Sequence, residues 1–125
     1  MIHTFALSFS DDENSTPVIY TSTASGDGQT NVDVFVASGA SNHAIAAVID
    51  ISEVKSLLIN SDITAGITFK SGANTVQSMT LSGNKPLLWQ EGFPNTCPIT
   101  GDFTQIVVTS ASADLNVKGF FLNNV

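Results

Sequence analysis

The 125-residue sequence has the length of one domain, and 42% of its residues are hydrophobic while only 12% are charged. One core can therefore form beneath a surface that is polar but mostly uncharged. Eleven acidic residues against four lysines and no arginine give a net charge of -7, which excludes the clustered cations that nucleic-acid binding requires.

The first strand is predicted from Phe5, Leu7 and Phe9, which alternate with polar or small residues and so share one face. The acidic and polar run 11–16 interrupts this pattern, and a second strand over 18–23 follows Pro17. Together they predict a hairpin with a solvated loop. A Gly-Asp-Gly turn then leads to a third strand, with Val32, Val34 and Val36 on one face.

The stretch 43–50 fits two structures, because its alanines favour a helix whereas the alternation of Ile45, Ala47 and Ile49 favours a strand. We predict a strand. Residues 51–55 then resemble a single helical turn or a bend. Further strands recur about every ten residues, separated mostly by turns that contain Gly or Asn. They are predicted at 56–60, 66–70, 75–81, 86–90, 103–109 and 115–122.

Nine or ten short strands without a long helix predict an all-β fold, an antiparallel β-sandwich or a jelly-roll-like arrangement. A barrel is the alternative. We expect one domain in all, with the sandwich body over 41–125. The segment 1–40 is a candidate arm that reaches a neighbouring subunit. No apolar stretch approaches the roughly 18 residues of a membrane span, and the N-terminus has no basic leader, so we expect no membrane partner.

Side chains that carry chemistry are scarce, and we expect neither an enzyme nor a cofactor. His3 and His43 have no zinc-ligand spacing. The acidic run Asp11–Glu13 contains oxygen ligands that suit calcium, but its irregular spacing favours a solvated turn. Cys97 is the only cysteine, so it has no partner for an intrachain disulfide and is interpreted as a packed thiol.

Aromatic residues are the candidate binding groups. Trp89 ends an apolar strand and shares a face with Leu87, which favours a core position. The alternative is a carbohydrate- or receptor-binding module in which Trp89 and Tyr20 stack on a sugar. The adjacent Phe120 and Phe121 point to opposite faces, so at least one of them is exposed to a partner. The candidate interface residues are Phe5, Leu7, Phe9 and Phe121.

The order of segments between residues 50 and 122 resembles that of small β-sandwich virion proteins of tailed bacteriophages, of the capsid decoration or cement type. The matching segments are the runs DISEVKSL at 50–57, ITFKS at 67–71, NKPLLW at 84–89 and DFTQIVVTSAS at 102–112. They span about three-fifths of the chain and leave out residues 1–40. Ser110 departs from the family, which has Asn in a Thr-Asn-Ala-Ser turn.

The resemblance implies a protein made in the host cytoplasm and located on the virion capsid surface. Its partner would be the major capsid protein lattice, and it would form a homo-oligomer, most simply a trimer at three-fold positions. It would add buried contact area between capsomers and stabilise the assembled shell. The alternative function is a carbohydrate- or receptor-binding module on a phage fibre or tail.

Overall fold

The computed structural model describes residues 1–10, 13 and 16–124 of the chain. Within this range the fold is all-β, with ten strands and one short 3-10 helix. The elements are β1 (Ile2–Phe9), β2 (Val18–Ser25), β3 (Gly28–Val36), β4 (Ser41–Ile49), η1 (Ile51–Glu53), β5 (Val54–Ser61), β6 (Ala65–Ser71), β7 (Asn74–Leu81), β8 (Leu87–Gln90), β9 (Phe103–Ser110) and β10 (Leu115–Asn123).

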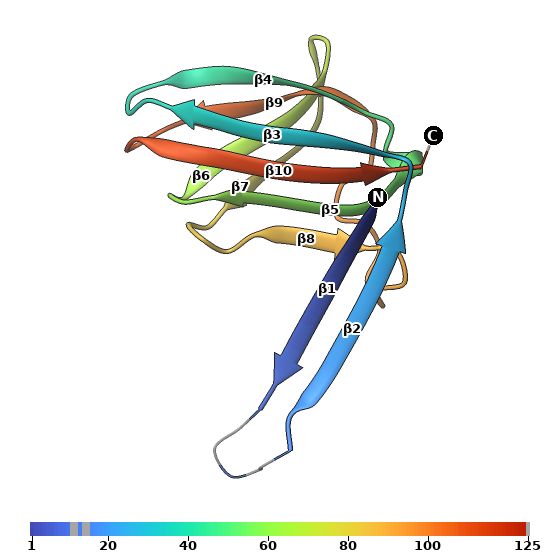
Figure 1. The fold of residues 1–125 in the computed structure, drawn as a ribbon. Coiled ribbons are helices and arrows are strands. Elements are labelled where there is room, and N and C mark those ends of the chain that lie inside the picture. Colours follow the sequence, from blue (N-terminus) through green and yellow to red (C-terminus); the bar gives the residue numbers. More distant parts are fainter. Residues whose placement is uncertain (11–12, 14–15, 125) are drawn as a thin grey trace.

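Eight of these strands form a sandwich of two antiparallel sheets, with strand orders β3-β10-β5-β8 and β4-β9-β6-β7. We call these the first sheet and the second sheet (Figure 1). Strand β3 pairs with β10, β4 with β9, β5 with β8 and β6 with β7. Strands β3 to β10 thus form one long hairpin, which is rolled up so that β5 pairs with β10 and β6 pairs with β9. This is the jelly-roll arrangement, and it confirms the predicted fold class.

The core lies between the two sheets and is built from alternate residues of their strands. Ile59 and Phe121 of the first sheet and Phe69 and Ile106 of the second sheet are fully buried. Phe103 links the two layers, because its ring centroid lies 4.9 Å from that of Phe69 and 5.9 Å from that of Phe121. These aromatic contacts join the sheets at the centre of the sandwich.

Residues 43–49 of the ambiguous stretch lie in β4, so the strand prediction is confirmed, with Ile45, Ala47 and Ile49 facing the core. The helical turn predicted after it is also present as η1. Asp50 caps this turn by accepting hydrogen bonds from the Ser52 hydroxyl at 2.6 Å and the Ser52 backbone N–H at 3.0 Å. These bonds lower the pKa of the Asp50 carboxyl below its ordinary value.

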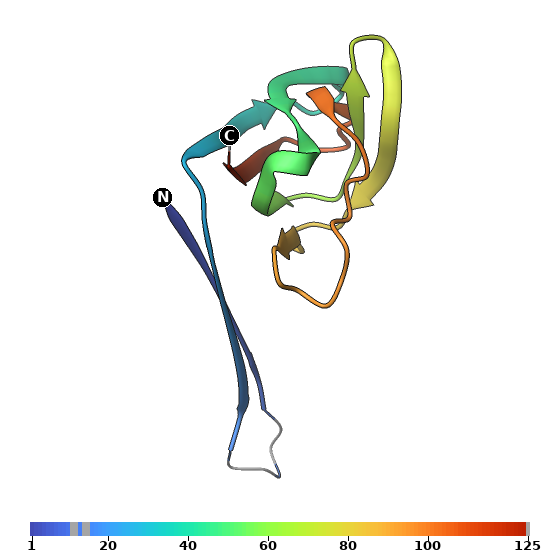
Figure 2. The same cartoon turned by 90° about the vertical axis from the view of Figure 1, so that its right-hand side faces the viewer.

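The hairpin of β1 and β2 is a separate two-stranded sheet that projects from the sandwich (Figures 1 and 2). The predicted arm boundary at residue 40 is wrong, because β3 is an edge strand of the first sheet and pairs with β10 along its whole length. The projecting part ends near residue 25. Sequence periodicity identified all three strands but carried no information about which of them joins the body.

Gly26 forms the junction between the hairpin and the body. Its backbone N–H donates to the Met1 carbonyl at 3.0 Å, and the next residue, Asp27, donates to the Asn123 carbonyl at 3.1 Å. A Cβ atom at Gly26 would lie 2.5 Å from the Asn123 carbonyl oxygen and 3.0 Å from Leu122 Cγ. The hairpin can approach β10 this closely only because residue 26 has no side chain.

We predict that Gly26→Ala lowers the free energy of unfolding by about 1–3 kcal/mol, because the new methyl group meets a backbone oxygen that cannot move aside. The matched control is Gly28→Ala, where a Cβ atom would have no neighbour within 4 Å. Urea denaturation of the two variants measures the difference. Equal stabilities would contradict the close packing of the hairpin base against β10.

Candidate partner interface

A short polar network attaches the base of the hairpin to the outer face of the first sheet. His3 Nδ1 lies 3.1 Å from Ser56 Oγ, and His3 Nε2 lies 3.0 Å from Gln29 Oε1. The Gln90 amide donates to Ser22 Oγ at 2.9 Å and accepts from Ser56 Oγ at 3.2 Å. Gln90 is only 2% exposed. Its buried amide therefore binds β2 and β5 at once, which fixes the hairpin on the sheet.

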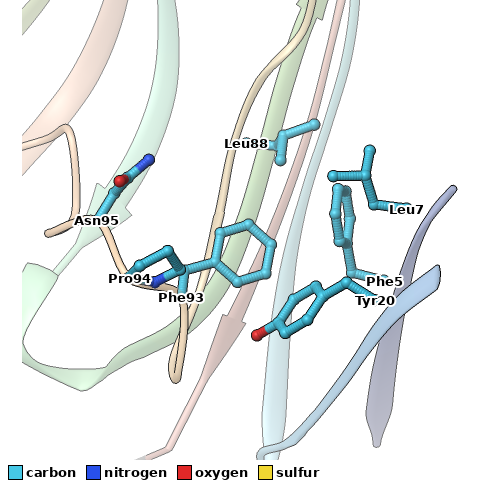
Figure 3. A pocket seen from close by; sticks show the side chains of 7 residues that line it. All are labelled: Phe5, Leu7, Tyr20, Leu88, Phe93, Pro94 and Asn95. Atoms are coloured by element: carbon cyan, nitrogen blue, oxygen red, sulfur yellow. The ribbon is translucent and has the colours of Figure 1, made fainter. Parts of the chain in front are cut away.

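An apolar groove of about 430 Å³ lies beside this network, between the hairpin and the edge of the first sheet (Figure 3). One wall is formed by side chains of β1 and β2, and the other by β8 and the loop that follows it. The lining residues are Phe5, Leu7, Tyr20, Leu88, Phe93, Pro94 and Asn95.

Phe93 is the centre of the groove, since two aromatic side chains of the hairpin meet its ring. The Phe5 and Phe93 centroids are 5.0 Å apart at an interplanar angle of 64°, and those of Tyr20 and Phe93 are 5.9 Å apart at 68°. Such edge-to-face pairs contribute about 0.5–1.5 kcal/mol each beyond the burial of their area. Tyr20 also donates its hydroxyl to the Gly92 carbonyl at 3.4 Å. The loop after β8 thus contacts the half of the hairpin that lies nearest the sandwich.

In the half of the hairpin that is farther from the sandwich, the apolar face continues past the groove. Leu7 pairs with Tyr20 and Phe9 pairs with Val18, so these four side chains lie on the same face as Phe5. We call Leu7, Phe9 and Val18 the distal face. Leu7, Phe9 and Val18 are 56%, 71% and 70% exposed. An apolar surface that continues from a packed groove into solvent is typical of an interaction site.

The predicted interface residues fall into two groups. Phe5, Leu7 and Phe9 lie on one face of the hairpin, with Phe5 half-buried in the groove and the other two exposed. The assignment of Phe121 to a partner surface is wrong, because its side chain is fully buried and contacts Phe103. Its neighbour Phe120 takes the outer position and is 39% exposed. The strand alternation that starts from Leu115 and Val117 places residue 121 inside.

The two residues of the alternative sugar-stacking site do not lie together. Trp89 pairs with the buried Leu57, packs against the core from the inner face of β8, and donates its indole N–H to the Asn95 carbonyl at 2.9 Å. Tyr20 lies in the groove with Leu88, whose side chain is on the opposite face of β8. Trp89 and Tyr20 therefore offer no common platform for one sugar ring.

Several chemical candidates are accounted for by local structure. His43 lies on β4, and Asp11 and Asp12 of the acidic run lie outside the described residues. Among residues 1–10, 13 and 16–124, no cluster of three or more His, Cys, Asp or Glu side chains is arranged to hold a metal ion. Cys97 is half-buried against the core, and burial raises the pKa of its thiol, although a hydrogen bond to the Ile99 backbone opposes the shift.

Sequence reasoning missed the residues that hold the hairpin. Leu88 and Phe93 complete the groove, while Ser56 and Gln90 form the polar network. The pattern Gly92-Phe93-Pro94 marked a loop but not its contacts. A polar residue at the end of the apolar strand 86–90 was the available indication, because such a residue needs a partner when it is buried.

Comparison with known proteins found no matching family model, no matching curated protein and no matching solved structure. In the part of the chain that the structure describes, no helix is long and apolar enough to cross a membrane.

We predict that Gln90→Ala loosens the hairpin, because it removes the hydrogen bonds that the buried amide makes to Ser22 and Ser56 and leaves Ser22 without its donor. The loss of these two bonds should lower the free energy of unfolding by about 1–3 kcal/mol. Hydrogen exchange of the β1 and β2 amides should accelerate more than exchange in β9. Gln105→Ala is the control, since its amide bonds the Gly72 carbonyl at an exposed position. Unchanged exchange in β1 and β2 would refute the role of Gln90.

We predict that Cys97 reacts several-fold more slowly with a disulfide reagent in the native protein than in urea at the same neutral pH. Burial raises the thiol pKa, so the folded protein holds less of the reactive thiolate. The absorbance of the released thiol chromophore measures both rates. A native rate equal to the unfolded rate would show that Cys97 is not protected.

Proposed function

We propose that this protein is a non-enzymatic structural component that attaches to a larger protein assembly through the distal face of its hairpin. The observation that carries the proposal is the exposure of Phe9 and Val18 on the same face as the packed Phe5. In the described chain, the loop after β8 covers the part of that face nearest the sandwich, and the part near the tip of the hairpin projects into solvent.

The physical argument concerns the stability of the hairpin. A two-stranded hairpin is only marginally stable in water unless another layer covers its apolar face. Complete burial of Phe9 or Val18 contributes about 1.5–3 kcal/mol each. The hairpin therefore gains both order and free energy when a partner surface covers the distal face, which is the behaviour expected of an attachment arm.

The assembly that we propose is the capsid of a tailed bacteriophage, with this chain as a decoration or cement protein on the lattice of the major capsid protein. The resemblance of residues 50–122 to such proteins supports this choice, as does a surface with few charges. A subunit that binds only the assembled shell stabilises it by its binding free energy. We expect a closed trimer, since closed symmetry covers strand edges without open-ended growth.

The rival function, sugar binding by Trp89 and Tyr20 on a fibre or tail, has less support. The two rings lie on opposite faces of β8, and the indole N–H of Trp89 is already bonded within the protein. No second function is proposed for these residues.

We predict that the double variant Phe9→Ser/Val18→Ser binds empty capsid shells at least thirtyfold more weakly than the unmodified protein. This factor corresponds to a loss of about 2 kcal/mol of apolar burial. Co-sedimentation with shells of the major capsid protein encoded in the same genome measures the affinity, and sedimentation equilibrium measures the oligomeric state. Thermal stability should change little, because both side chains are exposed in the free protein.

The matched control is Ile19→Ser, which removes an equally exposed apolar side chain from the opposite face of the same hairpin. This control should bind shells as the unmodified protein does. If the unmodified protein ignores shells, or if Ile19→Ser and the double variant lose binding equally, attachment through the distal face is refuted.

A further inference from the structure

A polar pocket of about 240 Å³ lies on the outer side of the first sheet, at the far end from the hairpin base. It is lined by Asn60, Asp62, Asn84, Asn116 and Lys118, which come from β5, the turn after it, the loop before β8, and β10. Its volume is below the roughly 300–1,000 Å³ of sites for drug-sized ligands. The pocket therefore suits a ligand of about one ring.

Backbone hydrogen bonds hold the pocket walls together. Asp62 Oδ1 accepts the backbone N–H of Asn116 at 2.8 Å, and the Asp62 backbone N–H donates to the Asn116 carbonyl at 3.3 Å. The Asn84 backbone N–H donates to the Ser61 carbonyl at 2.8 Å, which ties the loop before β8 to the end of β5. Three separate segments thus contribute polar side chains to one space, and hydrogen bonds join their backbones.

Asn60 has an unused hydrogen-bonding group. Its Oδ1 is buried and has no hydrogen-bond partner among the residues that the structure describes. An unpaired buried acceptor destabilises the free protein. A half-turn of the amide exchanges its oxygen and nitrogen, so the side chain can offer either an acceptor or a donor to a bound molecule. A ligand with hydroxyl groups, which both donate and accept, can bond whichever atom of the amide faces the pocket.

The charges of the pocket balance each other. Asp62 contributes one carboxylate, and Lys118 contributes one ammonium group that forms no ion pair within the described part of the chain. The remaining lining groups are the amides of asparagines, which are neutral. This set favours a neutral molecule with several hydroxyl groups over an anion or a metal ion.

An apolar step lies next to the pocket on the same face of the sheet. Asn60 pairs with Lys118, and the next pair on this face is Leu58 with Phe120. Phe120 is 39% exposed. An aromatic ring beside a group of amides and a carboxylate matches the two sides of a pyranose, whose C–H groups pack on a ring while its hydroxyl groups form hydrogen bonds.

We propose that this pocket binds a single neutral sugar ring, with its hydroxyl groups on Asn60, Asn116 and Lys118 and its apolar side toward Phe120. The site is separate from the hairpin and does not depend on the attachment function. It also does not use Trp89 or Tyr20.

The test is a nitrogen-15 NMR titration of the full chain with the methyl glycosides of glucose, galactose, mannose and N-acetylglucosamine. At least one of these sugars should shift the side-chain amides of Asn60 and Asn116 and the backbone of residues 118–120, with saturation in the millimolar range. Free glycine serves as a zwitterion probe and should cause no saturable shift at these residues. Saturation by glycine alone, or no saturable shift with any sugar, overturns the proposal.

Two variants locate the site. Asn60→Ala should weaken sugar binding at least tenfold while the denaturation midpoint stays constant or rises, because it removes an unpaired buried group. Lys118→Met should also weaken sugar binding, and because Lys118 is exposed, the substitution should leave the fold intact. The control, Asn74→Ala, removes an exposed amide from the second sheet and should bind normally. Equal binding by all three variants, or shifts confined to Tyr20 and Phe93, overturns the assignment.

Discussion

The buried amide of Gln90 determines where the hairpin stands, and the functional argument depends on that position. One side chain, at the end of the edge strand β8, bonds Ser56 on the neighbouring strand and Ser22 on the hairpin. Because a buried amide requires both partners, the hairpin has one satisfactory orientation at its base. Phe93 then packs on Phe5 and Tyr20 and covers the part of the same hairpin face that lies nearest the sandwich. What remains apolar and exposed is the part that these two contacts do not reach.

The two proposed surfaces differ in the physics of their recognition. The distal face offers area without directional groups, so it suits a partner whose surface supplies matching shape and apolar contact. The pocket at the other end of the first sheet offers directional groups in a small volume, so it suits a small ligand with matching hydroxyl groups. The base of the hairpin lies beside the C-terminal end of β10, whereas the pocket lies near the other end of that strand, so the two surfaces share no residue.

The sequence predicted those features that depend on local patterns. Alternation identified the strands, including β4 despite its alanines, and placed Phe5, Leu7 and Phe9 on one face. Features that depend on contacts between distant segments were not predictable. The position of β3 follows from its pairing with β10, and the groove follows from the approach of residues 5 and 93, which are far apart in the chain. The inner position of Phe121 was predictable from the alternation of Leu115 and Val117, and assigning it to the surface was an error of one residue, which exchanges the core and the surface.

The pairing of β10 between β3 and β5 has a consequence for the order in which the protein can fold. The first sheet has its final strand in an interior position, with a neighbour on each side. During synthesis, β3 and β5 leave the ribosome first, and both lack the strand that lies between them until residues 115–123 emerge. Contacts over such long sequence separations slow folding and leave strand edges open in the meantime. The nascent chain therefore passes through a period in which it is prone to aggregation, and the insertion of its last strand ends that period.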